Sequence, residues 1–218
     1  QSGPTGTVSS SSVTFAFGGV PSGDTAKIQC KIDAGAFTDC QTPLNLSSLS
    51  QGAHTVYFRA EDEAGNQDLS PATRTFKVDT IAPETSIFTG PSGTITSSYA
   101  TLTFIGYPSD DVAEFQCQVD AGSFFQCSNP MVLQDLQDGI HMVRVRALDQ
   151  AGNQDATPAT REFTVDTTAP VITITEGPVG TTTTSSARFA FDSNEPATFE
   201  CRMDGGSWTP CQSPWSYS

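Results

Sequence analysis

A period of 87 residues constrains the fold of this chain more than any other feature of its sequence. Gly-Pro pairs begin at Gly3, Gly90 and Gly177, each 87 residues after the last. Longer runs keep the same interval: AGNQD begins at 64 and 151, and VDT begins at 78 and 165. In the third copy the interval falls to 84 by Cys201, which indicates a three-residue deletion. A period this long suits a small autonomous domain better than a solenoid unit of about 20–45 residues.

Within the second copy, apolar and polar residues alternate in several short segments. Leu102 and Phe104 are the apolar members of one segment, and Val143 and Val145 belong to another. A period of two places one face of a strand on a core and the other in water. With the remaining short segments, the copy has about seven strands separated by turn residues. This pattern predicts an all-β fold of tandem immunoglobulin-like, Greek-key β-sandwich repeats.

The period divides the chain into three repeats. Repeat 1 spans 1–80 and lacks its first strand, repeat 2 spans 81–167 and is complete, and repeat 3 spans 168–218 and holds the N-terminal part only. We therefore expect an array that continues in both directions. An alternative is that a neighbouring molecule supplies the missing strands, as in donor-strand assembly.

Six cysteines fall in three pairs, each pair ten residues apart with a glycine at its midpoint. This symmetry predicts a β-hairpin with the two cysteines directly opposite, at a Cα separation that suits a disulfide. Local pairing alone puts equivalent bridges in all three copies: Cys30–Cys40, Cys117–Cys127 and Cys201–Cys211. Zinc is disfavoured, because zinc sites use C-x2–4-C spacings. Disulfides indicate an oxidising compartment and hence a secreted or cell-surface protein.

The charge balance excludes some partners. Twenty-four acidic residues against ten basic ones give a net charge of −14. Such a surface repels a phosphate backbone, so we expect no nucleic-acid partner, and an anionic membrane surface is disfavoured for the same reason. No apolar run approaches the roughly 20 residues of a membrane span, so no membrane insertion is expected in this segment.

Two motifs of the second copy carry a family resemblance. They are the strand that ends in RALDQAGN at 146–153 and the VDTTAP junction at 165–170. In these motifs the chain resembles the bacterial immunoglobulin-like repeats of large surface and secreted proteins. The resemblance implies a sandwich fold, a cell-surface or secreted location, and a stalk, spacer or adhesive role. Such repeats also stand beside catalytic modules of secreted enzymes, so the resemblance alone does not fix the function.

Recurrent carboxylates form one candidate site. They lie in the turn after a central strand and at the junction to the next repeat: Asp62, Asp68, Asp79, Asp149, Asp155 and Asp166. In related giant adhesins calcium stiffens such junctions, so the resemblance implies calcium here, an ion that takes six to eight oxygen ligands. The alternative is that these side chains form Asx-turns and accept backbone hydrogen bonds.

The junctions at 79–83 and 166–170 each end in a proline. Proline fixes its own φ and biases the preceding residue towards an extended conformation. We therefore expect restricted links that favour a rod-like array over freely jointed domains, with a mildly flexible hinge as the alternative.

Aromatic residues form a second candidate site. Phe37, Phe124 and Trp208 occupy equivalent positions just past the hairpin tips. By alternation from the cysteines they face outward, where they are available to a sugar, a protein or a neighbouring chain. The structural alternative is that each ring covers the tip glycine or the opposite strand. His54 and His141 also recur once per repeat, but without a nucleophile placed by a motif, so we expect turn residues there.

These features predict a protein that is not an enzyme, because an active site is normally singular and every candidate here recurs with the repeat. We expect an extracellular structural or adhesive array that forms a stalk, fibre or filament on a bacterial surface. Its partners would be neighbouring repeats of the same chain, further copies in a filament, and a host or matrix glycan or protein. The alternative is an array of carbohydrate- or protein-binding modules, accessory to a secreted enzyme, that gains avidity from repetition. That alternative would use the aromatics or the outward face of Arg144 and Arg146.

Overall fold

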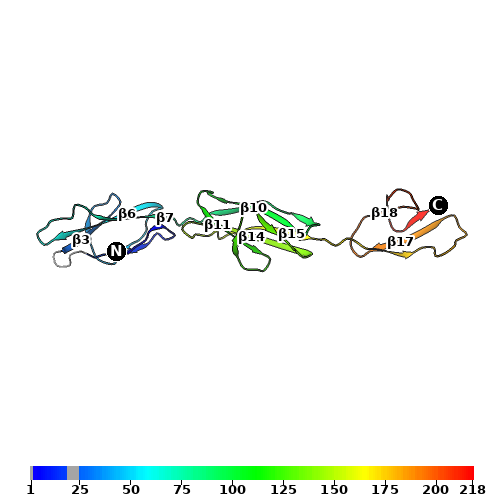
Figure 1. Ribbon diagram of the computed structural model, residues 1–218, viewed down its shortest axis with the longest axis horizontal. Coiled ribbons are helices and arrows are strands. Elements are labelled where there is room, and N and C mark those ends of the chain that lie inside the picture. The colour runs from blue at the N-terminus through cyan, green and yellow to red at the C-terminus, as the bar shows by residue number, and fades with distance from the viewer. Residues whose placement is uncertain (1, 19–24) are drawn as a thin grey trace. The chain divides into compact units, whose positions relative to one another are not determined.

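The computed structural model describes residues 2–18 and 25–218. Strands joined by turns make up the secondary structure of these ranges (Figure 1). The chain divides into two compact units, unit 1 (Gln1–Val165) and unit 2 (Asp166–Ser218). Repeats 1 and 2 lie in unit 1. Across the described ranges, we find no helix with the length and apolar character needed to cross a membrane.

Repeat 2 is a sandwich of two sheets. Its strands are β8 (Glu84–Thr89), β9 (Gly93–Ile95), β10 (Ala100–Tyr107), β11 (Val112–Val119), β12 (Phe125–Cys127), β13 (Met131–Leu133), β14 (Gly139–Asp149) and β15 (Ala159–Val165). One sheet has the order β13-β10-β8 and the other β12-β11-β14-β15-β9. The strand that sequence analysis missed is β9, which pairs in parallel with β15 and places Thr94 opposite Thr164. Three residues are too few to show an alternation.

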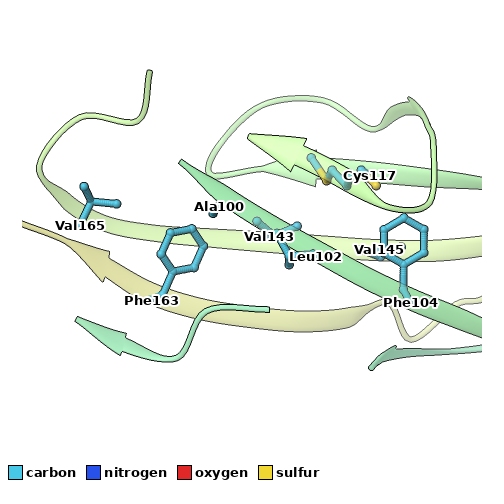
Figure 2. Packing of buried hydrophobic residues seen from close by; sticks show 9 residues of the cluster. Ala100, Leu102, Phe104, Cys117, Val143, Val145, Phe163 and Val165 are labelled. Atoms are coloured by element: carbon cyan, nitrogen blue, oxygen red, sulfur yellow. The ribbon is translucent and has the colours of Figure 1, made fainter. Parts of the chain in front are cut away.

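Alternating side chains of β10 and β14 build the core of repeat 2. Leu102 and Phe104 on β10 are completely buried, as are Val143 and Val145 on β14. Figure 2 shows these side chains meeting between the strands, together with Phe163 of β15. Full burial of an aliphatic or aromatic side chain contributes about 1.5–3 kcal/mol relative to leaving it exposed. The predicted all-β, immunoglobulin-like sandwich is confirmed.

Repeat 1 has the same plan. Its strands are β1 (Gly6–Val8), β2 (Val13–Phe15), β3 (Thr25–Ile32), β4 (Thr38–Cys40), β5 (Leu44–Leu46), β6 (Gly52–Asp62) and β7 (Ala72–Val78). The sheet β1-β7-β6-β3-β4 faces the pair β2-β5. Four phenylalanines lie in the core between them: Phe15, Phe17, Phe58 and Phe76. The ring centroid of Phe15 lies 5.7 Å from that of Phe58 and 5.8 Å from that of Phe76.

Unit 2 contains β16 (Ile172–Glu176), β17 (Ala187–Ser193), β18 (Phe199–Cys201), β19 (Thr209–Cys211) and β20 (Trp215–Tyr217). They form the sheet β16-β17-β20 and the hairpin β18-β19. All residues of 166–218 are described, and each of them is at least partly exposed. Unit 2 therefore holds the same hairpin without a closed core.

A disulfide joins the two hairpin strands in each repeat, with Cα atoms 5.8 Å apart in Cys30–Cys40 and 5.7 Å apart in the other two pairs. The expectation that the cysteines lie directly opposite one another is wrong. Cys117 faces Phe125 and Cys127 faces Phe115, so the bridge runs diagonally. The reason lies in the turn, where Asp120 adopts a left-handed φ of 51°. The turn is therefore centred one residue before Gly122, whose N–H donates to the Val119 carbonyl at 3.0 Å.

Candidate functional site

The predicted aromatics lie beside an arginine on the sheet face turned away from the core. The guanidinium carbon of Arg59 on β6 is 4.0 Å from the ring centroid of Phe37. The corresponding distance from Arg146 on β14 to Phe124 is 4.1 Å. A cation over an aromatic face is attracted by the ring quadrupole. Each ring therefore packs against the strand next to its own hairpin.

A glutamine orients each of these arginines. The Gln29 side-chain carbonyl accepts hydrogen bonds from Arg59 Nε at 2.9 Å and Nη2 at 2.7 Å. Gln116 accepts from Arg146 in the same way, at 3.0 and 2.8 Å. Sequence analysis missed this contact, although the glutamine and arginine both recur at the 87-residue period. The arrangement leaves one ring face covered by a guanidinium.

In unit 2, the guanidinium carbon of Arg202 lies 4.6 Å from the ring centroid of Trp208. Here the arginine comes from the segment that follows β18, and the indole is 56% exposed. Among the three predicted aromatics, Trp208 presents the most surface to solvent.

Each of the two histidines pairs with an aspartate that is nearly half exposed. His54 Nδ1 lies 2.8 Å from Asp33 Oδ2, and its Nε2 lies 2.9 Å from the Ser50 carbonyl. In repeat 2 the Nδ1 of His141 lies 2.9 Å from Asp120 Oδ2. Its Nε2 is 2.8 Å from the Gln137 carbonyl. Because acceptors face both ring nitrogens, the arrangement favours a doubly protonated imidazolium.

Hydrogen bonding to the Ser50 carbonyl and then to Asp33 raises the pKa of His54. The Gln137 carbonyl is the largest cause of the raised pKa of His141. Burial works against ionisation of Asp33, but hydrogen bonds from Thr55 and His54 lower its pKa overall. Each pair therefore links the aspartate at the start of the hairpin turn, Asp33 or Asp120, to the longest strand of its repeat, β6 or β14. The Ser50 hydroxyl also lies 3.5 Å from His54 Nε2, at the limit of a hydrogen bond.

The predicted carboxylates do not converge on one point. Asp62 accepts hydrogen bonds from the backbone of Ala64 and Asn66, at 2.9 and 2.8 Å. Asp68 accepts one from the Ser70 backbone at 2.8 Å. The equivalents Asp149 and Asp155 make the same turns with Asn153 and Thr157. Asp166 accepts a weaker bond from the Thr168 backbone at 3.3 Å.

Two members of the set do meet at the first junction. In the described part of the chain, one group of three carboxylates, Asp79, Asp111 and Asp149, has its oxygen atoms within 4.8 Å of one another. The Lys77 ammonium lies 2.9 Å from Asp79 Oδ2. Burial and then the charges of Asp79 and Asp149 raise the pKa of Asp111. Asp111 was not among the residues predicted from the sequence, although Asp24 occupies the equivalent position in repeat 1.

The first junction is also fixed by hydrogen bonds. The Asp79 N–H donates to the Val8 carbonyl at 2.9 Å, and its own carbonyl accepts from Asn153 Nδ2 at 2.7 Å. Gln51 bonds both the backbone N–H and the side chain of Thr80. The link residue Asp79 therefore has partners in both repeats of unit 1.

The sequence matches a known family model in two segments. The model describes a bacterial Ig-like domain (group 3) and matches residues 38–106 and 129–190, together more than half of the chain. The comparison with curated proteins finds no match.

The comparison with solved structures finds multidomain chains at low sequence identity. One holds fibronectin(III)-like modules of Clostridium thermocellum CbhA, with 16% identity, a TM-score of 0.47, and coverage of 74% of this chain and 89% of that one. Another holds the FN1–FN3 domains of chicken CNTN1, with 13% identity, a TM-score of 0.43, and coverage of 75% and 66%.

Proposed function

Because the chain belongs to the bacterial Ig-like domain (group 3) family, we propose that its repeats form an extracellular structural or adhesive array on a bacterial surface. In this proposal the array is a stalk, fibre or filament and has no catalytic role. Its partners are neighbouring repeats and further copies of the chain.

The observation that carries the proposal is the set of three equivalent disulfides. Each joins adjacent strands of a hairpin, and no cysteine is left free. Disulfides persist in oxidising compartments and are rare in the bacterial cytosol. A bridge at the same place in every repeat is useful to a chain that must keep its fold outside the cell.

The distribution of the polar clusters also supports an architectural role. The histidine pair and the glutamine–arginine–aromatic cluster each occur in both repeats of unit 1, at equivalent positions. Each group contacts a second strand or turn of its own repeat. Groups that recur and are satisfied in this way stabilise a scaffold. A catalytic site usually gathers groups once, in one cleft.

Fractionation of producing cells tests this proposal. We expect proteinase treatment of intact cells to remove the protein, and electron microscopy of the native material to show long filaments or thin isolated rods. Filaments would make it a fibre-forming protein, and rods would make it a stalk. Protein confined to the cytosol with all six cysteines free would overturn the proposal.

The second candidate function is binding of a carbohydrate or protein by the repeated aromatics, accessory to a secreted enzyme. The observation that favours it is Trp208, whose indole is 56% exposed on the hairpin. A glycan-array measurement on the full chain tests it, with Trp208→Ala as the variant. Leu69→Ala removes an apolar side chain that is still more accessible, 95% exposed, and is the matched control. Binding lost in the first variant and kept in the second would establish this function, and no binding would remove it.

A further inference from the structure

Three carboxylates from two repeats gather at the first junction. Asp79 follows β7 of repeat 1, whereas Asp111 precedes β11 and Asp149 ends β14 of repeat 2. Their oxygen atoms lie within 4.8 Å of one another, and Asp79 and Asp149 are buried. Like charges this close repel, and burial strengthens the repulsion by lowering the local dielectric. A positive charge nearby would relieve this repulsion.

Lys77 supplies that charge from within the chain. Its ammonium donates to Asp79 Oδ2 at 2.9 Å. The same positive charge acts on Asp111 and Asp149, and all three carboxylates contribute to the raised pKa of Lys77. The lysine belongs to repeat 1, and two of its three carboxylates belong to repeat 2. Its charge therefore acts across the junction.

With the Lys77 ammonium among them, the carboxylates do not fit the calcium ion that the family resemblance implies. Calcium takes six to eight oxygens. Both oxygens of Asp149 already accept hydrogen bonds from Asn153, at 2.8 and 2.7 Å. Asp79 Oδ2 accepts the Lys77 ammonium, and Oδ1 lies 3.4 Å from the Ile81 N–H. An ammonium within this group also repels a second cation.

The lysine is particular to this junction. At the equivalent place in β15, opposite Thr94, repeat 2 has Thr164. The register of the two strands is the same, since Lys77 on β7 lies opposite Thr7 of β1. A threonine is therefore compatible with the strand, and the lysine is not needed to form it.

We propose that the Lys77 ammonium takes the place of a metal ion at the first junction, pairing with Asp79 and offsetting part of the repulsion among Asp79, Asp111 and Asp149, and thereby fastening repeat 1 to repeat 2. This inference is independent of the proposed function, which requires no particular chemistry between repeats. It predicts a junction that neither needs calcium nor responds to chelation.

The test is Lys77→Thr in the full chain, measured by thermal unfolding and by calorimetric titration with calcium chloride. Lys31→Thr is the matched control, because it removes the same charge from the outer face of the same repeat, where Lys31 lies over the Tyr57 ring. In chelator, we expect Lys77→Thr to lower the Tm of unit 1 by about 2 °C more than the control. The native chain should show no saturable calcium binding.

Removing the lysine should also uncover a cation site. We expect Lys77→Thr to bind calcium with a Kd on the order of 10⁻⁴–10⁻³ M, as extracellular calcium modules do. Calcium should then restore its lost Tm, and adding Asp111→Asn should abolish both effects. The proposal is overturned if the native chain binds calcium and Asp111→Asn removes that binding. Equal melting of Lys77→Thr and Lys31→Thr in chelator, with no calcium bound by either, would overturn it as well.

Discussion

Repeat 2 and unit 2 share their first strands and differ in how their core is closed. The sheet β16-β17-β20 repeats the arrangement of β8, β10 and β13, and both hairpins carry a disulfide with Cα atoms 5.7 Å apart. An edge-to-face aromatic pair is also kept, with centroids 4.8 Å apart for Phe104–Phe115 and 5.0 Å for Phe191–Phe199. Phe104 is nevertheless fully buried, whereas Phe191 is partly exposed.

This difference distinguishes the parts of the fold that form between residues close in sequence from those that need strands later in the repeat. The hairpin, its disulfide and its aromatic contact form between residues close in sequence, and they are the same in both regions. Burial of the core requires β14 and β15, whose valines and phenylalanine cover β10 in repeat 2. In unit 2 the matching apolar side chains line an open hollow of about 320 Å³. The hairpin geometry is thus the same with and without a closed core.

Replacing the equivalent core phenylalanines with alanine should give the largest difference in lost stability between the two regions. Phe104→Ala is expected to destabilise repeat 2 by about 3–5 kcal/mol, because a fully buried ring leaves a cavity. Phe191→Ala should cost about 1–2 kcal/mol, since its site is already open to solvent. Denaturant unfolding followed by hydrogen exchange in β14 and β17 measures both. Equal losses would mean that the two cores are equally closed.

Removal of the disulfides should show how much each hairpin depends on its bridge. Replacing both cysteines of either pair with serine is expected to cost about 2–3 kcal/mol for a loop this short. β11 also pairs with β14, whereas β18 pairs with β19 alone. Hydrogen exchange should therefore show a retained β11 in Cys117→Ser/Cys127→Ser and an unprotected β18 in Cys201→Ser/Cys211→Ser. Retained protection of β18 would contradict this difference.

The histidine pairs should make unit 1, but not unit 2, sensitive to pH. The chain has two histidines, His54 and His141, both in unit 1. Their folded pKa is raised, so their stabilisation is fully present below the unfolded pKa of about 6.5 and is lost as pH rises through the folded value. The lowered pKa of Asp120 means that its own contribution is lost at acidic pH, as pH falls through that value.

His141→Gln measures this effect in repeat 2. At pH 6 we expect it to cost about 0.5–1.5 kcal/mol, because it removes hydrogen bonds to two partly exposed groups, the Asp120 carboxylate and the Gln137 carbonyl. The difference from the native chain should shrink in alkaline solution, and NMR titration of the native imidazole should give a midpoint above the ordinary value. A midpoint at or below that value would show that the ring is not held as an imidazolium.

Removing the arginine of an arginine–aromatic contact should give the smallest difference in lost stability between repeat 2 and unit 2. Arg146→Ala is expected to cost about 0.5–1 kcal/mol, because the guanidinium contacts both a ring and Gln116. Arg202→Ala removes only the contact with an exposed indole, so its effect on unfolding should be a few tenths of a kcal/mol at most. Thermal unfolding measures the first, and Trp208 fluorescence reports the second. A larger loss of stability in Arg202→Ala than in Arg146→Ala would contradict the idea that the added contact with Gln116 makes Arg146 the more stabilising arginine.

The sequence predicted the parts of the fold that repeat with a visible pattern. Alternation at Leu102 and Phe104 placed β10, and the spacing of cysteines around glycine placed the hairpins. The diagonal register of Cys117 and Cys127 was missed, because it depends on the left-handed φ of Asp120, which no spacing shows. β9 was missed because it makes a three-residue parallel pair with a strand remote in sequence.

The candidate sites were less predictable, since they depend on distances between strands. The period drew attention to His54 and the carboxylates, but it could not show that Asp33 lies 2.8 Å from the imidazole. Lys77 has no counterpart in repeat 2, where Thr164 stands, but Asp111 recurs as Asp24 in repeat 1. The period could not show that Lys77 and these carboxylates meet, because the contact joins strands of two repeats.

Disulfide mapping of the native protein tests the central claim most directly. Protein released by protease from the outside of intact cells would be digested without reduction and analysed by mass spectrometry. We predict three linkages, Cys30–Cys40, Cys117–Cys127 and Cys201–Cys211, with no free thiol. Free cysteines, or bridges between repeats, in protein that stays inside the cell would contradict an extracellular array of disulfide-bonded Ig-like repeats.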